Sequence, residues 1–302
     1  MNALPGRRFH FWLVWLGLLG WVWAASRVLL QVGSPQAQAG LVDGVGDQAR
    51  LAKPIRLAAL SSGSVLVADI NNHALRQVDE DGRVSTVVGQ GLKAPHGVAV
   101  AADGRVAVAD AESNQIFLVD STTHQLTLLA GDGLQGASDG PNAEARFSAP
   151  HSICWGPSGQ LFVADIGNGS LRVIEQGRTR TLAHEGLKWP MDLAVDSQGQ
   201  LWIADAGLQT ILKWSEQSGL SRPYPDLLLQ MPHGLCVGPD GSVYVAEMRS
   251  NRVTRTDPEG QLSVFWDEGL LKPAAVLWGR DGLWIADLGH HRILRVSPPV
   301  QP

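Results

Sequence analysis

The chain has 302 residues, 44% of them hydrophobic, and a formal net charge of −5 at pH 7. This length can build one sizeable β-domain and leaves little for a second. Because the net charge is negative, the chain lacks the excess of Lys and Arg with which proteins bind the phosphates of nucleic acids. We therefore expect no nucleic-acid partner.

The first 25 residues differ in kind from the rest. Arg7 and Arg8 precede an apolar stretch at residues 9–25, which predicts a secretory signal peptide or a signal anchor. Val22 and Ala24 satisfy the small-residue rule for cleavage near Ala24. Cleavage and retention both remain open at this point. Either alternative places residues 26–302 outside the cytoplasm, in a periplasm or at a cell surface, secreted or held to the membrane by the amino-terminal helix.

A short apolar segment directly follows this leader. Residues 28–33 read VLLQVG and match VSTVVG at 84–89 and LTLLAG at 126–131, which have the alternation of outer strands. The carboxyl-terminal repeat unit ends at Val296 without such a segment. We therefore predict that the amino-terminal strand completes the last unit, because an unpaired sheet edge would otherwise remain.

The rest of the chain repeats one phrase six times, as in VADINNHALRQVD at 67–79 and IADLGHHRILRVS at 285–297. Successive copies are separated by 41, 55, 40, 42 and 40 residues, measured between the acidic residues at the strand ends. A period near forty residues is typical of propeller blades or a solenoid. The acidic residues are Asp69, Asp110, Asp165, Asp205, Glu247 and Asp287.

Each unit consists of a proline, a short apolar strand, a Gly-containing turn, a second strand that ends in the acidic residue, a polar loop and another alternating strand. No helical periodicity intervenes. Six such units arranged radially protect one another's edges, so the sequence predicts an all-β, six-bladed β-propeller. Because short carboxylates fix turns by accepting backbone N–H bonds, their presence in all six units indicates an architectural role.

The units resemble NHL repeats, whose consensus places Pro-x-Gly before the inner strand and Ala-Asp-x-x-Asn-His after the second strand. Asn72-His73 and His290-His291 stand where that consensus has its Asn and His. The resemblance covers roughly residues 27–302 and implies an NHL-type propeller. It implies little about activity, because unrelated functions share this fold.

Two long connections, residues 33–54 and 131–150, share a pattern. In both, an Asp-Gly pair (Asp43 and Asp139) lies eleven residues before the proline, and an Ala-Arg pair (Arg50 and Arg146) precedes an apolar residue. We expect these arginines to staple their blades by pairing with local carboxylates or carbonyls.

Three histidines occupy equivalent positions, directly after the proline of their unit: His96, His151 and His233. Neutral imidazoles are common zinc ligands, so these residues form a candidate zinc or calcium site at the channel mouth. The alternative, which we favour, is a structural role in which each imidazole bonds to a neighbouring loop. The arrangement resembles that of the six-bladed peptidylglycine α-amidating lyases, which bind zinc at proline-adjacent sites of alternate blades. Here units two, three and five contribute instead, and the lyases' catalytic tyrosine has no counterpart. We expect no amidating activity.

The proline segments and the loops after the acidic residues should crowd one rim of the channel, which we predict to be the binding surface. We favour a non-catalytic extracytoplasmic module that binds a protein, peptide or small molecule there. A metal-dependent hydrolase or lyase is the alternative, and a structural subunit of an envelope complex is a third possibility. An uncleaved leader would add a membrane contact. The candidate ligand-binding residues are Arg56, Glu112, Asp192, Arg249 and Trp189.

Overall fold

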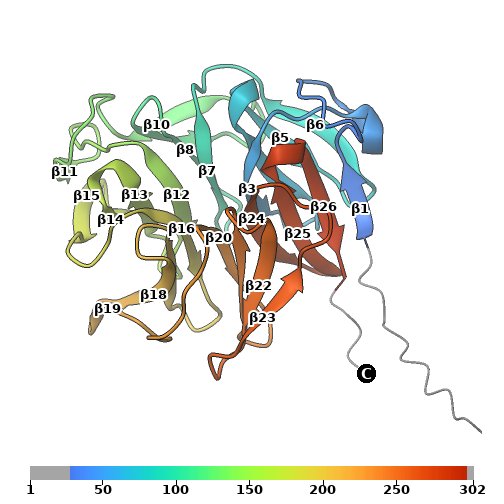
Figure 1. The fold of residues 1–302 in the computed structure, drawn as a ribbon. Coiled ribbons are helices and arrows are strands. Elements are labelled where there is room, and N and C mark those ends of the chain that lie inside the picture. Colours follow the sequence, from blue (N-terminus) through green and yellow to red (C-terminus); the bar gives the residue numbers. More distant parts are fainter. Residues whose placement is uncertain (1–27, 298–302) are drawn as a thin grey trace, which may run out of the picture.

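The computed structural model describes residues 28–297, which form a six-bladed β-propeller (Figure 1). The predicted leader, residues 1–25, lies outside the described residues. Within the described part, none of the helices has the length and apolar character needed to traverse a bilayer. They are single 3₁₀ turns: η1 (Gly46–Gln48), η2 (Ile70–Asn72), η3 (Ile166–Asn168) and η4 (Leu288–His290).

Each of the first three blades has four antiparallel strands, and blades 1 and 3 carry an additional two-residue strand at the outer edge. Blade 1 consists of β3 (Pro54–Ala59), β4 (Val65–Asp69), β5 (Ala74–Val78), β6 (Arg83–Val88) and the additional β2 (Gly44–Val45). Blade 2 consists of β7 (Pro95–Val100), β8 (Val106–Asp110), β9 (Gln115–Val119) and β10 (Leu126–Ala130). Blade 3 consists of β12 (Pro150–Trp155), β13 (Leu161–Asp165), β14 (Ser170–Glu175), β15 (Arg178–Ala183) and the additional β11 (Gly140–Pro141).

The other three blades also have four strands each. Blade 4 consists of β16 (Pro190–Val195), β17 (Leu201–Asp205), β18 (Thr210–Ser215) and β19 (Gly219–Ser221). Blade 5 consists of β20 (Pro232–Val237), β21 (Val243–Glu247), β22 (Arg252–Thr256) and β23 (Leu262–Trp266). Blade 6 consists of β24 (Pro273–Gly279), β25 (Gly282–Asp287), β26 (Arg292–Val296) and β1 (Val28–Val32).

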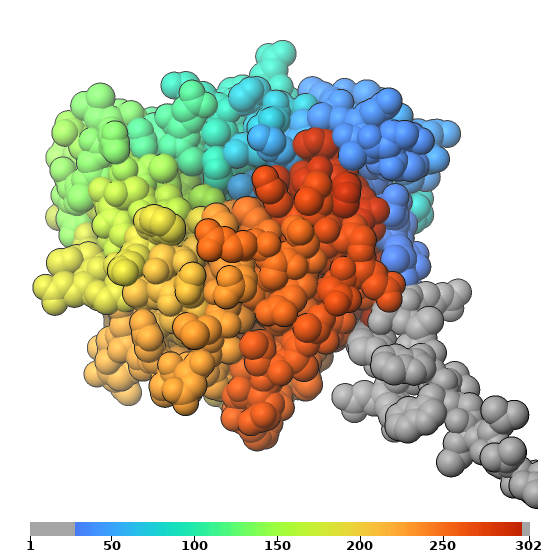
Figure 2. Space-filling model, in the orientation of Figure 1, coloured from blue at the N-terminus to red at the C-terminus, as the bar shows by residue number. Residues whose placement is uncertain are grey.

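The amino-terminal strand closes the ring, as predicted. β1 pairs with β26 in antiparallel register, with Val28 opposite Val296 and Val32 opposite Ile293. In Figure 2 the blue atoms of the amino-terminal part lie directly beside the red atoms of blade 6. The last blade therefore contains strands from both ends of the described chain. As a result, the edge of its third strand, β26, is paired and not exposed to solvent.

The inner strands β3, β7, β12, β16, β20 and β24 contact one another around a closed ring and enclose the central channel (Figure 1). Each begins at a proline, and that proline is paired with the acidic residue that ends the second strand, as in Pro54 opposite Asp69. We call the face at which the inner strands begin the proline face. The opposite face carries the turns between first and second and between third and fourth strands, and we call it the hairpin face.

The hydrophobic core consists of six clusters, each between neighbouring blades. Leu171 of blade 3 and Leu201 of blade 4, for example, belong to one cluster, while Val32 of β1 joins the cluster between blades 6 and 1. This arrangement follows from the alternation along each strand, because successive side chains point to opposite faces of a blade and both faces are covered by neighbours.

The repeated acidic residues prove to be architectural, as the sequence indicates. Each is fully buried and accepts hydrogen bonds from backbone N–H groups just ahead of the proline. Asp110 accepts bonds from Lys93 and Ala94, both at 2.7 Å, and Glu247 accepts one from Gln230 at 2.6 Å. These bonds fix the loops of the proline face, so the same residue that ends the second strand positions the entrance of the inner strand.

The two long connections are held to blades 1 and 3 by ion pairs. The most buried of these pairs involve arginines other than those predicted. Arg172 is fully buried and lies 2.9 Å from Asp165 and 2.7 Å from Asp139. Arg76 pairs with Asp69 and Asp43 in the same way in blade 1. The predicted Arg146 contributes a more exposed pair with Asp132 at 2.7 Å.

Candidate functional site

The first residues after the six prolines fill the channel near the proline face. The second residue after the proline differs from blade to blade and is charged in only two: Arg56 in blade 1 and Asp192 in blade 4. In a ring of six, these two blades lie opposite each other. The remaining blades supply small residues at this level: Gly97, Ser152, Gly234 and Ala275.

Arg56 and Asp192 meet across the channel. Arg56 Nη1 lies 2.5 Å from Asp192 Oδ2, and both side chains are about 5% exposed or less. Arg56 Nη2 also donates to the Met191 carbonyl at 2.9 Å. The inner strands of blades 5 and 6 also approach closely at this level, because a Cβ at Gly234 would lie 2.5 Å from the carbonyl oxygen of Ala274. The ion pair therefore forms a polar plug that ties opposite blades together.

The carboxylate of Asp192 is better satisfied than the guanidinium. Asp192 accepts bonds from Ser152 Oγ at 2.6 Å, Leu235 N at 2.8 Å and Leu193 N at 2.9 Å. Burial nevertheless raises the pKa of Asp192 above its ordinary value of 3.8, against the opposing effect of Arg56. Arg56 Nε is buried without a hydrogen-bond partner.

The three predicted histidines come together beside this plug. The ring of His151 is 4.9 Å from that of His96 and 5.1 Å from that of His233, measured between centroids. Each Nδ1 lies next to a backbone carbonyl: Ala94 at 3.0 Å for His96, Met191 at 2.8 Å for His151 and Ala274 at 2.8 Å for His233. A carbonyl can only accept, so Nδ1 carries the proton and Nε2 is left as an acceptor.

All three imidazoles are neutral at pH 7. Desolvation lowers the pKa of His233 from 6.5 to about 3, and the nearby Arg56 charge acts in the same direction. Burial likewise holds the pKa of His151 well below its ordinary value, with the other two histidines and Arg56 adding to the effect. The pKa of His96 is lowered for the same first reason.

The cluster does not fit a resident metal ion. Among residues 28–297, no group of three or more His, Cys, Asp or Glu side chains is arranged to hold one. In addition, Arg56 Nη2 lies 3.3 Å from His151 Nδ1, and a fixed positive charge at this distance opposes the binding of a dication. The structure therefore gives no support to the predicted zinc or calcium site, even though it brings its three histidines together.

The other candidate residues lie apart from the plug, in loops of the proline face. Trp189 is 57% exposed and packs over Gly207, where a Cβ would lie 3.3 Å from its ring. Glu112 and Arg249 are exposed in the loops that follow Asp110 and Glu247. The sequence thus placed all eight candidates on one face, whereas the structure separates a buried group around Arg56 and Asp192 from an exposed rim.

A cavity of about 320 Å³ lies behind the plug, between the inner strands and toward the hairpin face. Arg56 and Asp192 close it at one end, and it extends to Trp155 and Trp278 near the other. Its wall also includes Cys154 and Cys236, which are free thiols whose pKa is raised by burial. The plug therefore divides the channel, and a ligand arriving from the proline face meets the histidines and the rim.

Comparison with known proteins identifies the repeats. A family model described as "NHL repeat" matches residues 92–118 and 229–255, which belong to blades 2 and 5. NHL-repeat-containing protein 4 of Mus musculus is 33% identical over 118 residues, which are 39% of this chain and 79% of that protein. The chain belongs to the NHL-repeat family. The sequence resemblance to NHL repeats is thereby confirmed.

Other relatives of this NHL propeller are much longer proteins. Protein SUPPRESSOR OF QUENCHING 1, chloroplastic, of Arabidopsis thaliana is 29% identical over 200 residues, which make up 65% of this chain but only 18% of that protein. The chain spans less than a fifth of the length of this relative and 10% of the teneurins of Caenorhabditis elegans and Drosophila melanogaster. The similarity is therefore to one part of these proteins.

Solved structures share the fold at low identity. An auxiliary nutrient binding protein from Bacteroides thetaiotaomicron has a TM-score of 0.71 and 14% identity, with 91% of this chain and 76% of that chain covered. A gluconolactonase from Xanthomonas campestris has a TM-score of 0.67 and 17% identity, with 82% and 87% covered. Both a binding protein and an enzyme thus have this architecture, so the fold alone does not decide between these functions.

Sequence reasoning missed most of the exposed charge on the proline face. Besides Arg249, four lysines lie one or two residues before a proline and are exposed: Lys53, Lys93, Lys188 and Lys272. Their spacing to the proline was a usable signal, because the segment before each proline lies on the same face as the loop after each acidic residue.

The free energy of unfolding is expected to fall as the pH is lowered from about 6.5 toward 3. The unfolded chain binds a proton to each histidine below about 6.5, whereas folded His233 resists protonation until about pH 3. As far as these histidines are concerned, the free energy of unfolding is therefore highest above pH 6.5. Below that pH it falls by up to about 1.4 kcal/mol per pH unit for each such histidine. Urea unfolding at several pH values measures this slope.

The substitution His233→Gln separates this effect from the titration of carboxylates. Its amide can still donate to the Ala274 carbonyl but does not titrate, so the slope between pH 4.5 and 6.5 should decrease by up to about 1.4 kcal/mol per pH unit. His124→Gln, at an exposed turn, makes the same substitution outside the cluster and is the matched control with which the slope of His233→Gln is compared. Equal slopes in wild type and His233→Gln would contradict the neutral cluster.

Proposed function

We propose that this NHL propeller is a non-catalytic, extracytoplasmic recognition module that binds an acidic segment of a protein or peptide on its proline face. The observation that carries this proposal is the set of exposed cations around the channel mouth. We call them the rim cations: Lys53, Lys93, Lys188, Arg249 and Lys272.

The side chains of the rim cations form no ion pair with the described residues. Most arginines elsewhere in the described chain pair with carboxylates, as Arg172 and Arg252 do, but no rim cation takes part in an ion pair between residues 28 and 297. Five of the six blades contribute one. Among the described residues, Glu112 is the only carboxylate in the loops that directly follow the acidic strand ends, whereas Glu185, Asp267 and Glu268 are exposed farther back in the connections that lead to the prolines. A ring of unpaired positive charge in a chain of net charge −5 favours a negatively charged partner and speeds its encounter.

An apolar anchor lies within this charged ring. Trp189 directly follows Lys188 and exposes 57% of its surface, while the packing of its ring over Gly207 limits its conformational freedom. A rigid, amphipathic aromatic side chain is a typical centre of a protein-binding hot spot. The combination favours a peptide with acidic and apolar residues over a small inorganic anion.

The predicted export of the chain agrees with this surface. Val28, the first described residue, lies opposite Val296 at the hairpin face, on the side of the propeller away from the rim cations. If the leader is retained as a membrane anchor, the proline face remains available to a partner in the surrounding medium.

Binding of an acidic peptide tests the proposal. Fluorescein-labelled hexaglutamate should bind the protein in a fluorescence anisotropy titration, and hexalysine should not. The Kd should rise severalfold between 20 and 200 mM NaCl. Combined replacement of Lys53, Lys188 and Lys272 by alanine should weaken binding at least tenfold, because three charges near the ligand are lost at low ionic strength.

A matched control uses unpaired arginines elsewhere. Arg83, Arg178 and Arg222 are exposed and form no ion pair within the described part of the chain, and their combined replacement by alanine removes the same total charge. If both triple variants weaken binding equally, the attraction comes from net charge and not from the rim. Absence of hexaglutamate binding to the wild type would overturn the proposal.

The alternative of a metal-dependent hydrolase or lyase has less support. It needs a metal site, and the histidines that would provide one lie beside the Arg56 guanidinium. Elemental analysis of the purified protein decides the matter, since stoichiometric zinc or calcium that is lost on joint replacement of His96, His151 and His233 would favour the enzyme.

A further inference from the structure

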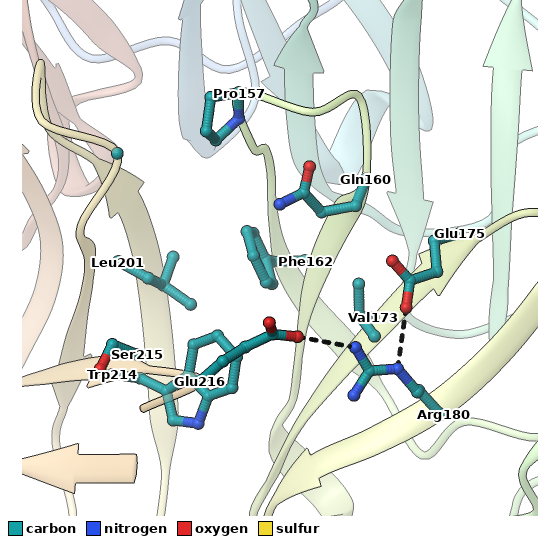
Figure 3. A pocket seen from close by; sticks show the side chains of 11 residues that line it. Pro157, Gln160, Phe162, Val173, Glu175, Arg180, Leu201, Trp214, Ser215 and Glu216 are labelled. Atoms are coloured by element: carbon teal, nitrogen blue, oxygen red, sulfur yellow. Dashed lines mark hydrogen bonds and ion pairs between the residues drawn. The ribbon is translucent and has the colours of Figure 1, made fainter. Parts of the chain in front are cut away.

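A second pocket lies far from the channel mouth, in the groove between blades 3 and 4 on the hairpin face (Figure 3). It encloses about 170 Å³. Phe162 and Val173 of blade 3 and Leu201 and Trp214 of blade 4 form its apolar wall, while Glu175, Arg180 and Glu216 line its polar side. This volume is well below the roughly 300–1,000 Å³ of pockets for drug-sized ligands and suits a single compact group.

Within the described part of the chain, no cation covers the aromatic pair of this groove. Three other tryptophans are: Arg105 lies over Trp155 at 4.4 Å, Lys213 over Trp202 at 4.0 Å and Arg295 over Trp284 at 5.1 Å. Trp214 instead meets Phe162 at 63°, with 5.9 Å between the ring centroids, and no cation of residues 28–297 lies over either ring. Phe162 is only 6% exposed, so the aromatic surface open to a ligand is mainly that of the half-buried Trp214, whose π face attracts a cation.

The polar side of the groove already stabilises a cation. Arg180 Nε lies 2.8 Å from Glu175, and Arg180 Nη2 lies 3.1 Å from Glu216 across the blade interface (Figure 3). These two carboxylates raise the pKa of Arg180. Together the three side chains leave one negative charge, and because Glu216 is 72% exposed, its bond to Arg180 is of the kind that contributes little stability and opens easily.

We propose that this groove binds a compact organic cation of the alkylated ammonium type, such as a trimethylammonium group. The methyl groups would pack against Phe162, Leu201 and Trp214, and the positive charge would face the aromatic rings and Glu216. An N-alkylated ammonium suits the groove better than a primary amine, because its apolar surface matches an apolar wall and its charge is more weakly hydrated. An anion is disfavoured by the net negative charge.

Arg180 acts in this proposal as an internal competitor. Its guanidinium satisfies the two carboxylates when the groove has no ligand, and it must release Glu216 when a ligand cation enters. Its removal therefore strengthens ligand binding, whereas removal of Trp214 or Glu216 weakens it. Opposite effects of neighbouring substitutions cannot both result from a folding defect.

Calorimetric titration of the full chain with choline chloride tests the site. Wild type should bind choline with a Kd in the millimolar range or tighter, and Arg180→Ala should tighten binding about threefold or more. Trp214→Leu and Glu216→Gln should each weaken it at least fivefold. Glu259→Gln, at an exposed turn of blade 5 on the same face, is the matched control and should have no effect.

The ammonium group could belong to a free molecule or to a lipid headgroup. Co-sedimentation with phosphatidylcholine vesicles, compared with phosphatidylglycerol vesicles, distinguishes these sources, and Trp214→Leu should abolish any vesicle binding that depends on choline. Failure of both choline and phosphatidylcholine to bind would overturn the proposal, as would weaker binding by Arg180→Ala. The rim cations lie on the other face, so either proposal can fail without the other.

Discussion

A chain that begins at Ser34, and therefore lacks β1, is expected to lose cooperative folding. β1 supplies the fourth strand of blade 6 and covers Ile293 and Val296, both fully buried, while Val32 joins the core between blades 6 and 1. Without β1 the protein loses a strand's hydrogen bonds and the burial of several apolar groups. The free energy lost in this way is comparable with the total stability of about 5–15 kcal/mol of a typical domain. The exposed edge of β26 should also promote aggregation.

Size-exclusion chromatography and thermal unfolding measure this outcome. A chain that begins at Ser26 keeps β1 and is the control, and it should elute as a folded species with one cooperative transition. If the chain from Ser34 unfolds with the same midpoint as that control, β1 does not close the ring. The result also bears on export, because any processing downstream of Val32 would remove the closing strand.

The fold could be predicted because its signal is repeated. Six copies of one phrase at a period near forty residues identify the blades without reference to any single residue. Even the circular closure left a signal, since residues 28–33 resemble the outer strands of other units while the last unit lacks one. Because an unpaired sheet edge is unfavourable, these two features together predict that the two ends of the chain meet in one blade.

The candidate site was only partly predictable. Equivalent positions after the prolines correctly brought His96, His151 and His233 to one place, because repetition fixes which residues share a level of the channel. The pairing of Arg56 with Asp192 was missed, although opposite charges at the same position of opposite blades were a usable signal. The groove around Trp214 could not be found, because its residues come from different strands of two blades and follow no repeat.

Separate and joint replacement of Arg56 and Asp192 should reveal strong coupling across the channel. Arg56→Met leaves a buried carboxylate without its counter-charge, and Asp192→Asn leaves a buried guanidinium, so each should lower the free energy of unfolding by about 3–5 kcal/mol. Ser152 Oγ donates to one carboxylate oxygen and Leu235 N to the other, so Asn keeps only one of these two acceptors and the variant loses a hydrogen bond together with the charge. The double variant should lose about 2–3 kcal/mol less than the sum of the single losses.

Urea unfolding of the four chains at pH 7 measures the coupling. The exposed pair of Arg105 and Asp103, joined at 2.8 Å with side chains 47% and 56% exposed, provides a matched cycle in which we expect only weak coupling, because solvent screens the two charges. Additive losses at Arg56 and Asp192 would mean that the two groups are stabilised separately by their other partners. Strong coupling would instead show that opposite blades are held together through the channel, which keeps the histidine cluster and the surrounding rim in a fixed arrangement for a partner.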